Sequence, residues 1–267
     1  MREEWPLKWL ELRVLDLDRE SAFWRALGLA ELRRSDSGAR FGAGGRELLT
    51  LQALPGGRSR PRGTAGLYHL AVLLPSRGDL ARFAKFGISR LKFTDASDHL
   101  VSEAIYFNDP EGNGIEVYAD RAREAWEWSG SRVRMDSIQL DVERLANDAE
   151  GDWSGFPPTT RLGHVHLSVA DLDRSQAWYE QMGMAVTATI PGAKFMSWDH
   201  YHHHIGLNVW AGRDLSPIAE SCAGLAGFVI SADSTDGSGQ DPDGVRIMTD
   251  AQGSDMRGTP PLSRTVR

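Results

Sequence analysis

The segments LELRVLDLDRESAFWRALGL (residues 10–29) and VHLSVADLDRSQAWYEQMGM (165–184) repeat one pattern in two distant parts of the chain. Each alternates apolar and polar residues, passes through Asp-Leu-Asp-Arg and ends in an aromatic pair followed by glycine. The alternation predicts a half-buried strand. The aspartate before the next apolar run is a typical helix N-cap. Each segment therefore predicts a strand followed by a helix.

Two further copies become visible once this strand is used as a template. Residues 66–88 (GLYHLAVLLPSRGDLARFAKFGI) contain a strand, a Pro-Ser turn and a helix, whereas 224–234 (GLAGFVISADS) has the strand without a clear helix. Short alternating runs bounded by glycine turns follow each copy, as in a β-meander. These runs are 39–53, 102–120, 193–211 and 244–250. We therefore predict an α+β fold of four βαβββ units, the last one eroded.

The units suggest a division of the chain into two domains. Residues 1–126 would form an N-terminal domain of two units, and 161–256 a C-terminal domain whose second unit is degenerate. The polar, Gly- and Pro-containing segment 127–160 reads as a linker with a short strand and helix in its middle. Residues 257–267 read as a poorly ordered tail.

Composition narrows the class of protein. The 267-residue chain is 41% hydrophobic and carries a net charge of -7, which argues against general nucleic-acid binding. One cysteine, Cys222, excludes an intramolecular disulfide framework. The charged first residues show no signal peptide, and no apolar run is long enough to cross a membrane. We expect a cytoplasmic protein. The eroded unit would leave sheet edges uncovered, which is consistent with a homo-oligomer.

Aligning the first strands of the four units produces one informative column. In units one to three, the residue seven positions before the helix entry is Trp9, His69 and His164; in unit four the aligned residue is Phe228. The last strand of unit two adds Glu116, a carboxylate between two apolar neighbours. Two imidazoles and one carboxylate that point inward from strands suit an Fe(II) or Mn(II) site with open coordination positions. The column therefore predicts a metal centre made of His69, His164 and Glu116.

The chain resembles the vicinal oxygen chelate superfamily of glyoxalases, bleomycin-resistance proteins and extradiol dioxygenases, most nearly its two-domain catechol 2,3-dioxygenase-like members. The motifs that carry the resemblance are GLYHLAVLLPSRGDL, ASDHLVSEAIYFNDPEGNGIEVYADR, GHVHLSVADLDRSQAWY and YHHHIGLNVWAGR. The resemblance implies two cup-shaped, barrel-like mixed sheets with a metal in one cup, at positions that match His69, His164 and Glu116. The more familiar arrangement places all ligands in the C-terminal units, where this chain has Phe228 and lacks the glutamate. Units two and three must therefore share the cup.

The implied activity is extradiol ring cleavage of a catechol- or hydroquinone-type aromatic with O₂, with Fe(II) or alternatively Mn(II) as cofactor. Such a reaction needs a proton-transfer group beside the metal, for which histidine is suited. The run DHYHHHIGLNVW (199–210) supplies candidates. If strand alternation runs through it, His204 and His202 line the cup, with His204 as acid–base group and His202 as its orienting partner. His99 is a further candidate at the cup mouth.

The remaining histidines have less specific interpretations. We expect His200 and His203 to face solvent, as in an ordinary polar strand. His166 alternates with His164 on one face and could either support the ligands or replace one of them. Gly206 lies near the place of a fourth ligand, so that place would be open.

Two other functions compete with the dioxygenase. One is a non-catalytic, bleomycin-resistance-like protein that binds small molecules, and the other is a glyoxalase-type isomerase or lyase. The binding protein predicts a cup without metal and leaves the two histidines and the glutamate without a purpose. The isomerase would favour a fourth carboxylate ligand, which the sequence does not show.

Overall fold

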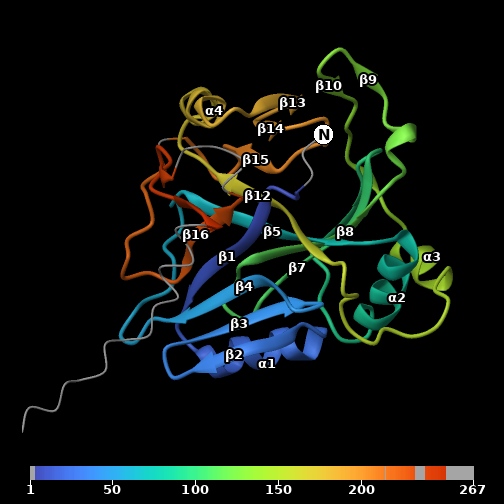
Figure 1. Ribbon diagram of the computed structural model, residues 1–267, viewed down its shortest axis with the longest axis horizontal. Coiled ribbons are helices and arrows are strands. Elements are labelled where there is room, and N and C mark those ends of the chain that lie inside the picture. The colour runs from blue at the N-terminus through green and yellow to red at the C-terminus, as the bar shows by residue number, and fades with distance from the viewer. Residues whose placement is uncertain (1–3, 214, 232–237, 251–267) are drawn as a thin grey trace, which may run out of the picture.

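The computed structural model describes residues 4–213, 215–231 and 238–250. Its helices and strands form a mixed α+β fold in which two large sheets curl into half-barrels (Figure 1). The predicted fold class is therefore confirmed. No helix in these three ranges is long and apolar enough to cross a membrane. Residues 257–267, predicted to be a tail, and the end of the predicted C-terminal domain lie outside the described residues.

A seven-stranded sheet combines units one and four. Its strands, in spatial order, are β17 (Gly239–Gln240), β18 (Arg246–Thr249), β16 (Gly224–Ile230), β1 (Leu7–Val14), β4 (Arg46–Ala53), β3 (Gly38–Ala43) and β2 (Ala30–Ser35). The first strands of the two units, β1 and β16, pair antiparallel at its centre. Phe228 is buried there, as a core residue.

A nine-stranded sheet combines units two and three. In spatial order it contains β11 (Ile138–Gln139), β6 (Asp95–Asp98), β7 (Ser102–Asn108), β8 (Gly114–Asp120), β5 (Gly66–Leu74), β12 (Arg161–Ser168), β15 (Ile205–Asn208), β14 (Ala193–Ser197) and β13 (Ala185–Ile190). The first strands β5 and β12 pair antiparallel at its centre. Units two and three thus share one curled sheet, as the histidine column required.

Each sheet therefore takes one unit from either side of the segment 127–160. Both sheets contain strands from the predicted N-terminal domain (1–126) and from the predicted C-terminal domain (161–256). The boundaries of these two domains stay a prediction. The segment between them folds onto the nine-stranded sheet through β11, which extends it beside β6. Its other elements are β9 (Trp128–Ser129), β10 (Arg132–Val133) and α3 (Val142–Asn147), and the short helix η1 (Arg123–Ala125) precedes it.

Local hydrogen bonds set the start of each long helix. The helices of units one to three are α1 (Leu17–Leu27), α2 (Arg77–Gly87) and α4 (Leu172–Gln181). They begin after Asp16, Ser76 and Asp171, whose side chains accept backbone N–H bonds from the first turn. The predicted helix entries at Asp16, Ser76 and Asp171 are therefore N-caps in the structure.

Candidate metal centre

Three strands of the nine-stranded sheet place the predicted ligands in one row. Ala71 on β5 pairs with Glu116 on β8 on one side and with His164 on β12 on the other. Residues paired across strands project to the same face of a sheet, and His69 shares the face of Ala71 because it lies two positions away. The small Ala71 side chain leaves room between the glutamate and the histidine. The concave face therefore brings His69, Glu116 and His164 together.

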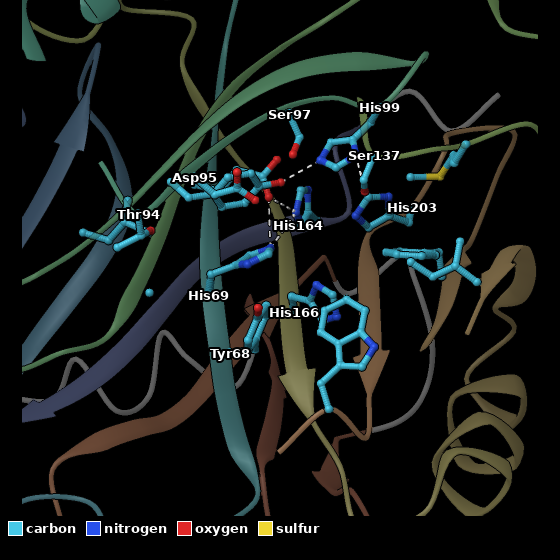
Figure 2. Close-up of a pocket in the computed structure, with 18 of the residues that line it drawn as sticks. Tyr68, His69, Thr94, Asp95, Ser97, His99, Ser137, His164, His166 and His203 are labelled. Atoms are coloured by element: carbon cyan, nitrogen blue, oxygen red, sulfur yellow. Dashed lines mark hydrogen bonds and ion pairs between the residues drawn. The ribbon is translucent and has the colours of Figure 1, made fainter. Parts of the chain in front are cut away.

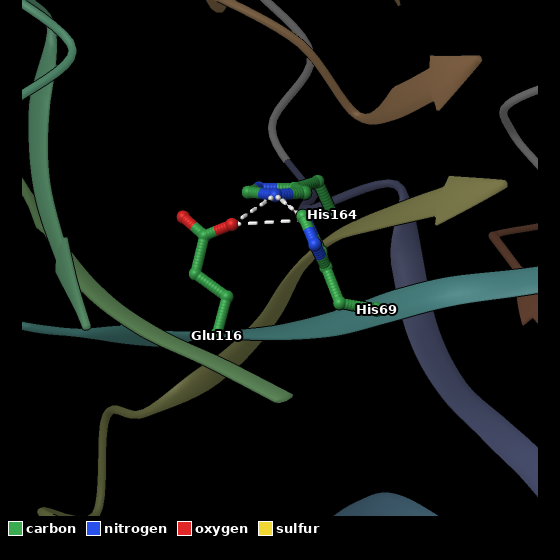
Figure 3. A group of neighbouring side chains, drawn as sticks. All are labelled: His69, Glu116 and His164. Atoms are coloured by element: carbon green, nitrogen blue, oxygen red, sulfur yellow. Dashed lines mark hydrogen bonds and ion pairs between the residues drawn. The ribbon is translucent and has the colours of Figure 1, made fainter. Parts of the chain in front are cut away.

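Their polar atoms meet at one point (Figure 3). The Nε2 atoms of His69 and His164 lie 3.3 Å apart, and each lies 3.0 Å from Oε2 of Glu116. All three side chains are buried, with exposed fractions of 6%, 2% and 2%. These three residues could hold one metal ion between them. Within the described part of the chain, no other group of three or more histidine, cysteine, aspartate or glutamate side chains could do so.

The pKa shifts of Glu116 and His69 suit metal ligands. Burial on its own would raise the pKa of Glu116, but the adjacent imidazoles of His164 and His69 outweigh it and hold the pKa well below its usual value. Burial lowers the pKa of His69, against the opposing effect of Glu116. An ionised carboxylate and a neutral imidazole are the forms that bind a cation.

The spacing also fits an ion. Neighbouring ligands on an octahedron with bonds of about 2.1 Å lie about 3.0 Å apart, close to the separations found here. Two nitrogens and one carboxylate oxygen on one side of an ion form the set typical of non-haem Fe(II). The residues present therefore fit a divalent metal.

The group lies at the base of a cavity of about 640 Å³ (Figure 2). Its wall is built mainly from β5 to β8 and from residues near β12 to β15. Besides the three proposed ligands it includes His99, His166 and His203, and a set of aromatic and apolar side chains. That set comprises Tyr68, Tyr106, Phe107, Ile115, Met135, Ile190, Pro191, Phe195 and Trp210. The cavity is therefore large enough and polar enough at its base for a small aromatic ligand.

The histidines of the run 199–210 lie differently around this cavity from what the sequence predicted. The strand β15 begins only at Ile205, so regular alternation does not extend back through 202–204. His203, expected to face solvent, is 5% exposed and lines the cavity, with its ring centroid 4.1 Å from that of His164. His200 is exposed, as expected, and its ring contacts Trp128.

His204 and His202 are not among the residues that line the cavity. His204 stacks on Tyr201, contacts Trp5 edge-on and shares a hydrogen bond with Ser197 through Nδ1, at 3.0 Å. The placement of both side chains on the cup wall was therefore wrong, because it assumed strand geometry where the chain turns.

His202 instead lies behind His203. Its Nε2 donates to Oδ1 of Asp120 at 3.0 Å, and its Nδ1 lies 2.7 Å from Nδ1 of His203. Since the carboxylate accepts from Nε2–H of His202, Nδ1 of His202 can accept from Nδ1–H of His203. Burial, with the neighbouring histidines, lowers the pKa of His203 well below its usual value. The chain Asp120–His202–His203 thus leaves a lone pair on Nε2 of His203.

A second polar pair lies on the other wall. Nδ1 of His99 lies 2.8 Å from the carbonyl oxygen of Asp136, and Nε2 lies 2.7 Å from the hydroxyl of Tyr106. Burial and the charge of Glu116 raise the pKa of Tyr106 well above its usual value, so the phenol stays neutral. His99 lines the cavity as predicted. Sequence reasoning missed Tyr106, although its pairing with Glu116 follows from the hairpin around the Asp109–Asn113 turn.

His166 occupies the space expected to be open at Gly206. The two residues pair across β12 and β15, and a Cβ added to Gly206 would lie 2.8 Å from Cγ of His166. The imidazole is 3% exposed, and its Nε2 has no hydrogen-bond partner among the described residues. It does not belong to the group able to hold one ion. Glycine at 206 therefore makes room for a cavity-lining histidine beside the proposed ligands.

Two sheets assembled from βαβββ units, with a buried His-His-Glu group in one of them, define a protein of the vicinal oxygen chelate fold. A sequence profile described as "Glyoxalase/Bleomycin resistance protein/Dioxygenase superfamily" matches residues 7–117. The chain is also 37% identical over 243 residues to a catechol-2,3-dioxygenase of Bacillus subtilis, covering 86% of this chain and 84% of that protein. The chain belongs to the glyoxalase/bleomycin resistance protein/dioxygenase superfamily.

Solved structures agree on the fold. One is a Bacillus subtilis protein described provisionally as a dioxygenase, with a TM-score of 0.55 and 14% identity over 97% of this chain and 78% of that chain. Another is the cppA protein of Streptococcus pneumoniae, with a TM-score of 0.54 and 10% identity over 89% and 94% of the two chains. At these identities the similarity concerns the fold alone.

Proposed function

We propose that this protein is an extradiol ring-cleaving dioxygenase that opens a small catechol- or hydroquinone-type aromatic with O₂. The 37% identity to a catechol-2,3-dioxygenase supports this class of reaction. The observation that carries the proposal is the convergence of His69, His164 and Glu116 at the base of an aromatic-lined cavity. Three protein ligands on one side of an ion leave the positions that a diol and O₂ require.

His69, His164 and Glu116 would hold Fe(II), or alternatively Mn(II). The chemistry that such an ion supplies when bound is Lewis acidity towards the diol oxygens and a template that brings O₂ beside them. The protein contributes a cavity that encloses the ring and polar groups on both sides of the ligands.

His203 is the group best placed to move a proton. A diol must lose protons as it binds through its oxygens, and the lone pair on Nε2 of His203 is available for one of them. His202 and Asp120 fix the opposite nitrogen through their hydrogen bonds. We therefore assign the acid–base role to His203 instead of His204. His202 becomes the residue that orients His203.

Tyr106 and His99 serve the other side of the cavity. The neutral phenol of Tyr106 lies beside Glu116, and its oxygen lies 2.7 Å from Nε2 of His99. Because the carbonyl of Asp136 accepts from Nδ1–H of His99, Nε2 accepts the phenol proton, and the phenol oxygen would accept a hydrogen bond from a substrate hydroxyl near Glu116. His99 is in this way a second acid–base candidate that reaches the substrate through Tyr106.

No observation on the described residues favours the binding protein or the glyoxalase-type enzyme over the dioxygenase. A binding protein without metal would not need three buried ligand-type atoms within about 3 Å of one another. A glyoxalase-type site closed by a fourth carboxylate would need a ligand in place of Gly206, where His166 packs instead. The dioxygenase remains the function best supported.

The test combines metal content with turnover. Protein purified anaerobically and supplied with Fe(II) should contain about one ion per chain and consume O₂ with catechol while the ring opens. His164→Ala and Glu116→Ala should lose both the ion and the activity. His200→Ala, an exposed position near the same run, should keep both. Metal retained in both ligand variants, or no ring opening by any diol, would exclude the proposal.

A further inference from the structure

The charged groups at the cavity mouth are all of one sign. No lysine or arginine is among the described residues that line the cavity; besides Glu116, its charged side chains are Asp95 and Asp136. Both aspartates are exposed, and one oxygen of each accepts only a neighbouring backbone N–H at 2.8 Å, from Ala96 and Ser137 respectively. The mouth is therefore negatively charged.

Arg134, a cation that senses the charge of Asp136, is paired with another carboxylate. Arg134 is attracted to Asp136, but its guanidinium pairs with Glu127 at 2.9 Å. Arg134 is not among the cavity-lining residues. A ligand at the cavity mouth can therefore contact the carboxylate of Asp136 without contacting Arg134.

Asp95 is directed into the cavity by its strand register. It pairs with Tyr106, which in turn pairs with Glu116, so the three side chains follow one row across β6, β7 and β8 on the concave face. Burial and then the charge of Asp95 raise the pKa of Tyr68 on β5, and Asp95 also adds, after burial and Glu116, to the raised pKa of Tyr106 on β7. Asp95 and Tyr68 both line the cavity (Figure 2). The negative charge of Asp95 therefore acts within the space that a substituent would occupy.

Aromatic rings complete the mouth. Tyr68 and Trp210 are 46% and 47% exposed although they are large, and their ring centroids lie 5.4 Å apart in an edge-to-face arrangement. Both line the cavity together with the two aspartates. Carboxylates beside aromatic rings bind alkylammonium groups through ion pairing and cation–π attraction. The same surroundings repel a carboxylate.

We propose that the substrate is a catechol whose side chain carries an ammonium group, and that Asp95, Asp136, Tyr68 and Trp210 select it against catechols that carry a carboxylate. This inference rests on the proposed function, because it takes the ring to lie at His69, His164 and Glu116. It adds the chemical nature of the substituent and the residues that recognise it.

Three catechols of similar size test the inference: 4-(2-aminoethyl)catechol, 4-ethylcatechol and 3,4-dihydroxyphenylacetate. With the full chain loaded with Fe(II), kcat/KM from O₂ uptake should be highest for the amine and lowest for the acid. The amine and the acid should differ by roughly tenfold or more, because like charges at a binding site are costly. The double variant Asp95→Asn/Asp136→Asn should bring the kcat/KM values of the amine and of the acid close to that of the neutral compound. Asp36→Asn, on an exposed turn of the other sheet, should leave the ratio unchanged.

The outcomes separate the two proposals. Equal or preferred cleavage of the acid, or an unchanged ratio in the double variant, would overturn the inference while leaving the dioxygenase intact. If none of the three is cleaved and catechol is not cleaved either, the proposed function fails. The inference is then decided by Kd values from quenching of tryptophan fluorescence, which should again be lowest for the amine and highest for the acid. Binding of the acid as tight as that of the amine, or binding of neither, would also overturn it.

Discussion

The Nε2 atoms of His69 and His164 lie 3.3 Å apart although 95 positions separate the two residues in the chain. The antiparallel pairing of β5 with β12 produces this proximity. The proposed metal site is therefore also the place where the two halves of the chain join, and binding there should affect stability as well as activity.

A bound metal ion should stabilise the fold, because its proposed ligands lie on the paired strands β5, β8 and β12. An ion that binds only the folded chain, at about 100 times its Kd, adds about 2.7 kcal/mol to the free energy of unfolding. For a chain of this size that corresponds to a rise in Tm of roughly 5–10 °C. Anaerobic thermal unfolding with and without Fe(II) or Mn(II) measures it. Glu116→Gln should show less than half of this rise, and an equal rise in the variant would contradict the role of Glu116.

His203 and His204 should respond differently to the same substitution. His203→Gln should lower kcat by roughly 10²–10⁴, the usual contribution of an acid–base group, with little change in Tm. His204→Gln should mainly lower Tm, because His204 packs between Trp5 and Tyr201. Steady-state kinetics and thermal unfolding of both variants check this. A larger loss of kcat in His204→Gln would restore the prediction made from strand alternation.

Asp120 should act through the tautomer of His203. Asp120→Asn keeps the shape but can donate to Nε2 of His202, which would reverse the hydrogen bonds and move the proton of His203 to Nε2. We expect kcat to fall by at least roughly tenfold with little change in KM, since the substrate does not touch Asp120. Glu124→Gln, an exposed position a few residues away, is the control. A change confined to KM would argue for a structural role instead.

Gly206 should tolerate no side chain. In Gly206→Ala the new Cβ would lie 2.8 Å from Cγ of His166, so the imidazole must shift into the cavity. We expect a loss of about 1–3 kcal/mol in the free energy of unfolding and a higher KM for catechol. Gly78→Ala in α2, where no heavy atom lies closer than 3.7 Å, is the matched control and should be neutral or stabilising. Urea unfolding and KM measurements compare the two, and equal behaviour would show that His166 is not constrained by Gly206.

Glu20 should make stability fall as the pH rises. It is fully buried on α1, and burial together with Asp109 and Glu111 raises its pKa from 4.5 to about 8. Because the folded state holds the proton more tightly, this contribution is complete below the unfolded pKa and is lost as the pH rises through about 8. Glu20→Gln should therefore be more stable than the native chain by about 1–3 kcal/mol at pH 8.5 and similar to it at pH 5. Unfolding measured at both pH values checks this, and a difference independent of pH would contradict it.

Much of the site could be predicted because repetition and chemistry coincide. His69 and His164 occupy the same place in two copies of one strand, and Glu116 is a carboxylate where the pattern requires an apolar residue. The positions of His202, His203 and His204 could not be predicted, since alternation applies only within a regular strand and β15 starts at Ile205. Tyr106 was missed because its place depends on the register of a hairpin.

By itself, the sequence determined the four units, the helix caps and the types of ligand, because these depend on local periodicity and on side chains near one another in the chain. Only the tertiary structure decided how the strands of units two and three pair within one sheet and which histidine faces the cavity. Pairing between β5 and β12 is a long-range choice among several edges of similar strands, and the direction of His203 follows from a turn packed against Asp120 through His202. Such choices depend on the free energy of the whole assembled core, which no short segment of the sequence contains.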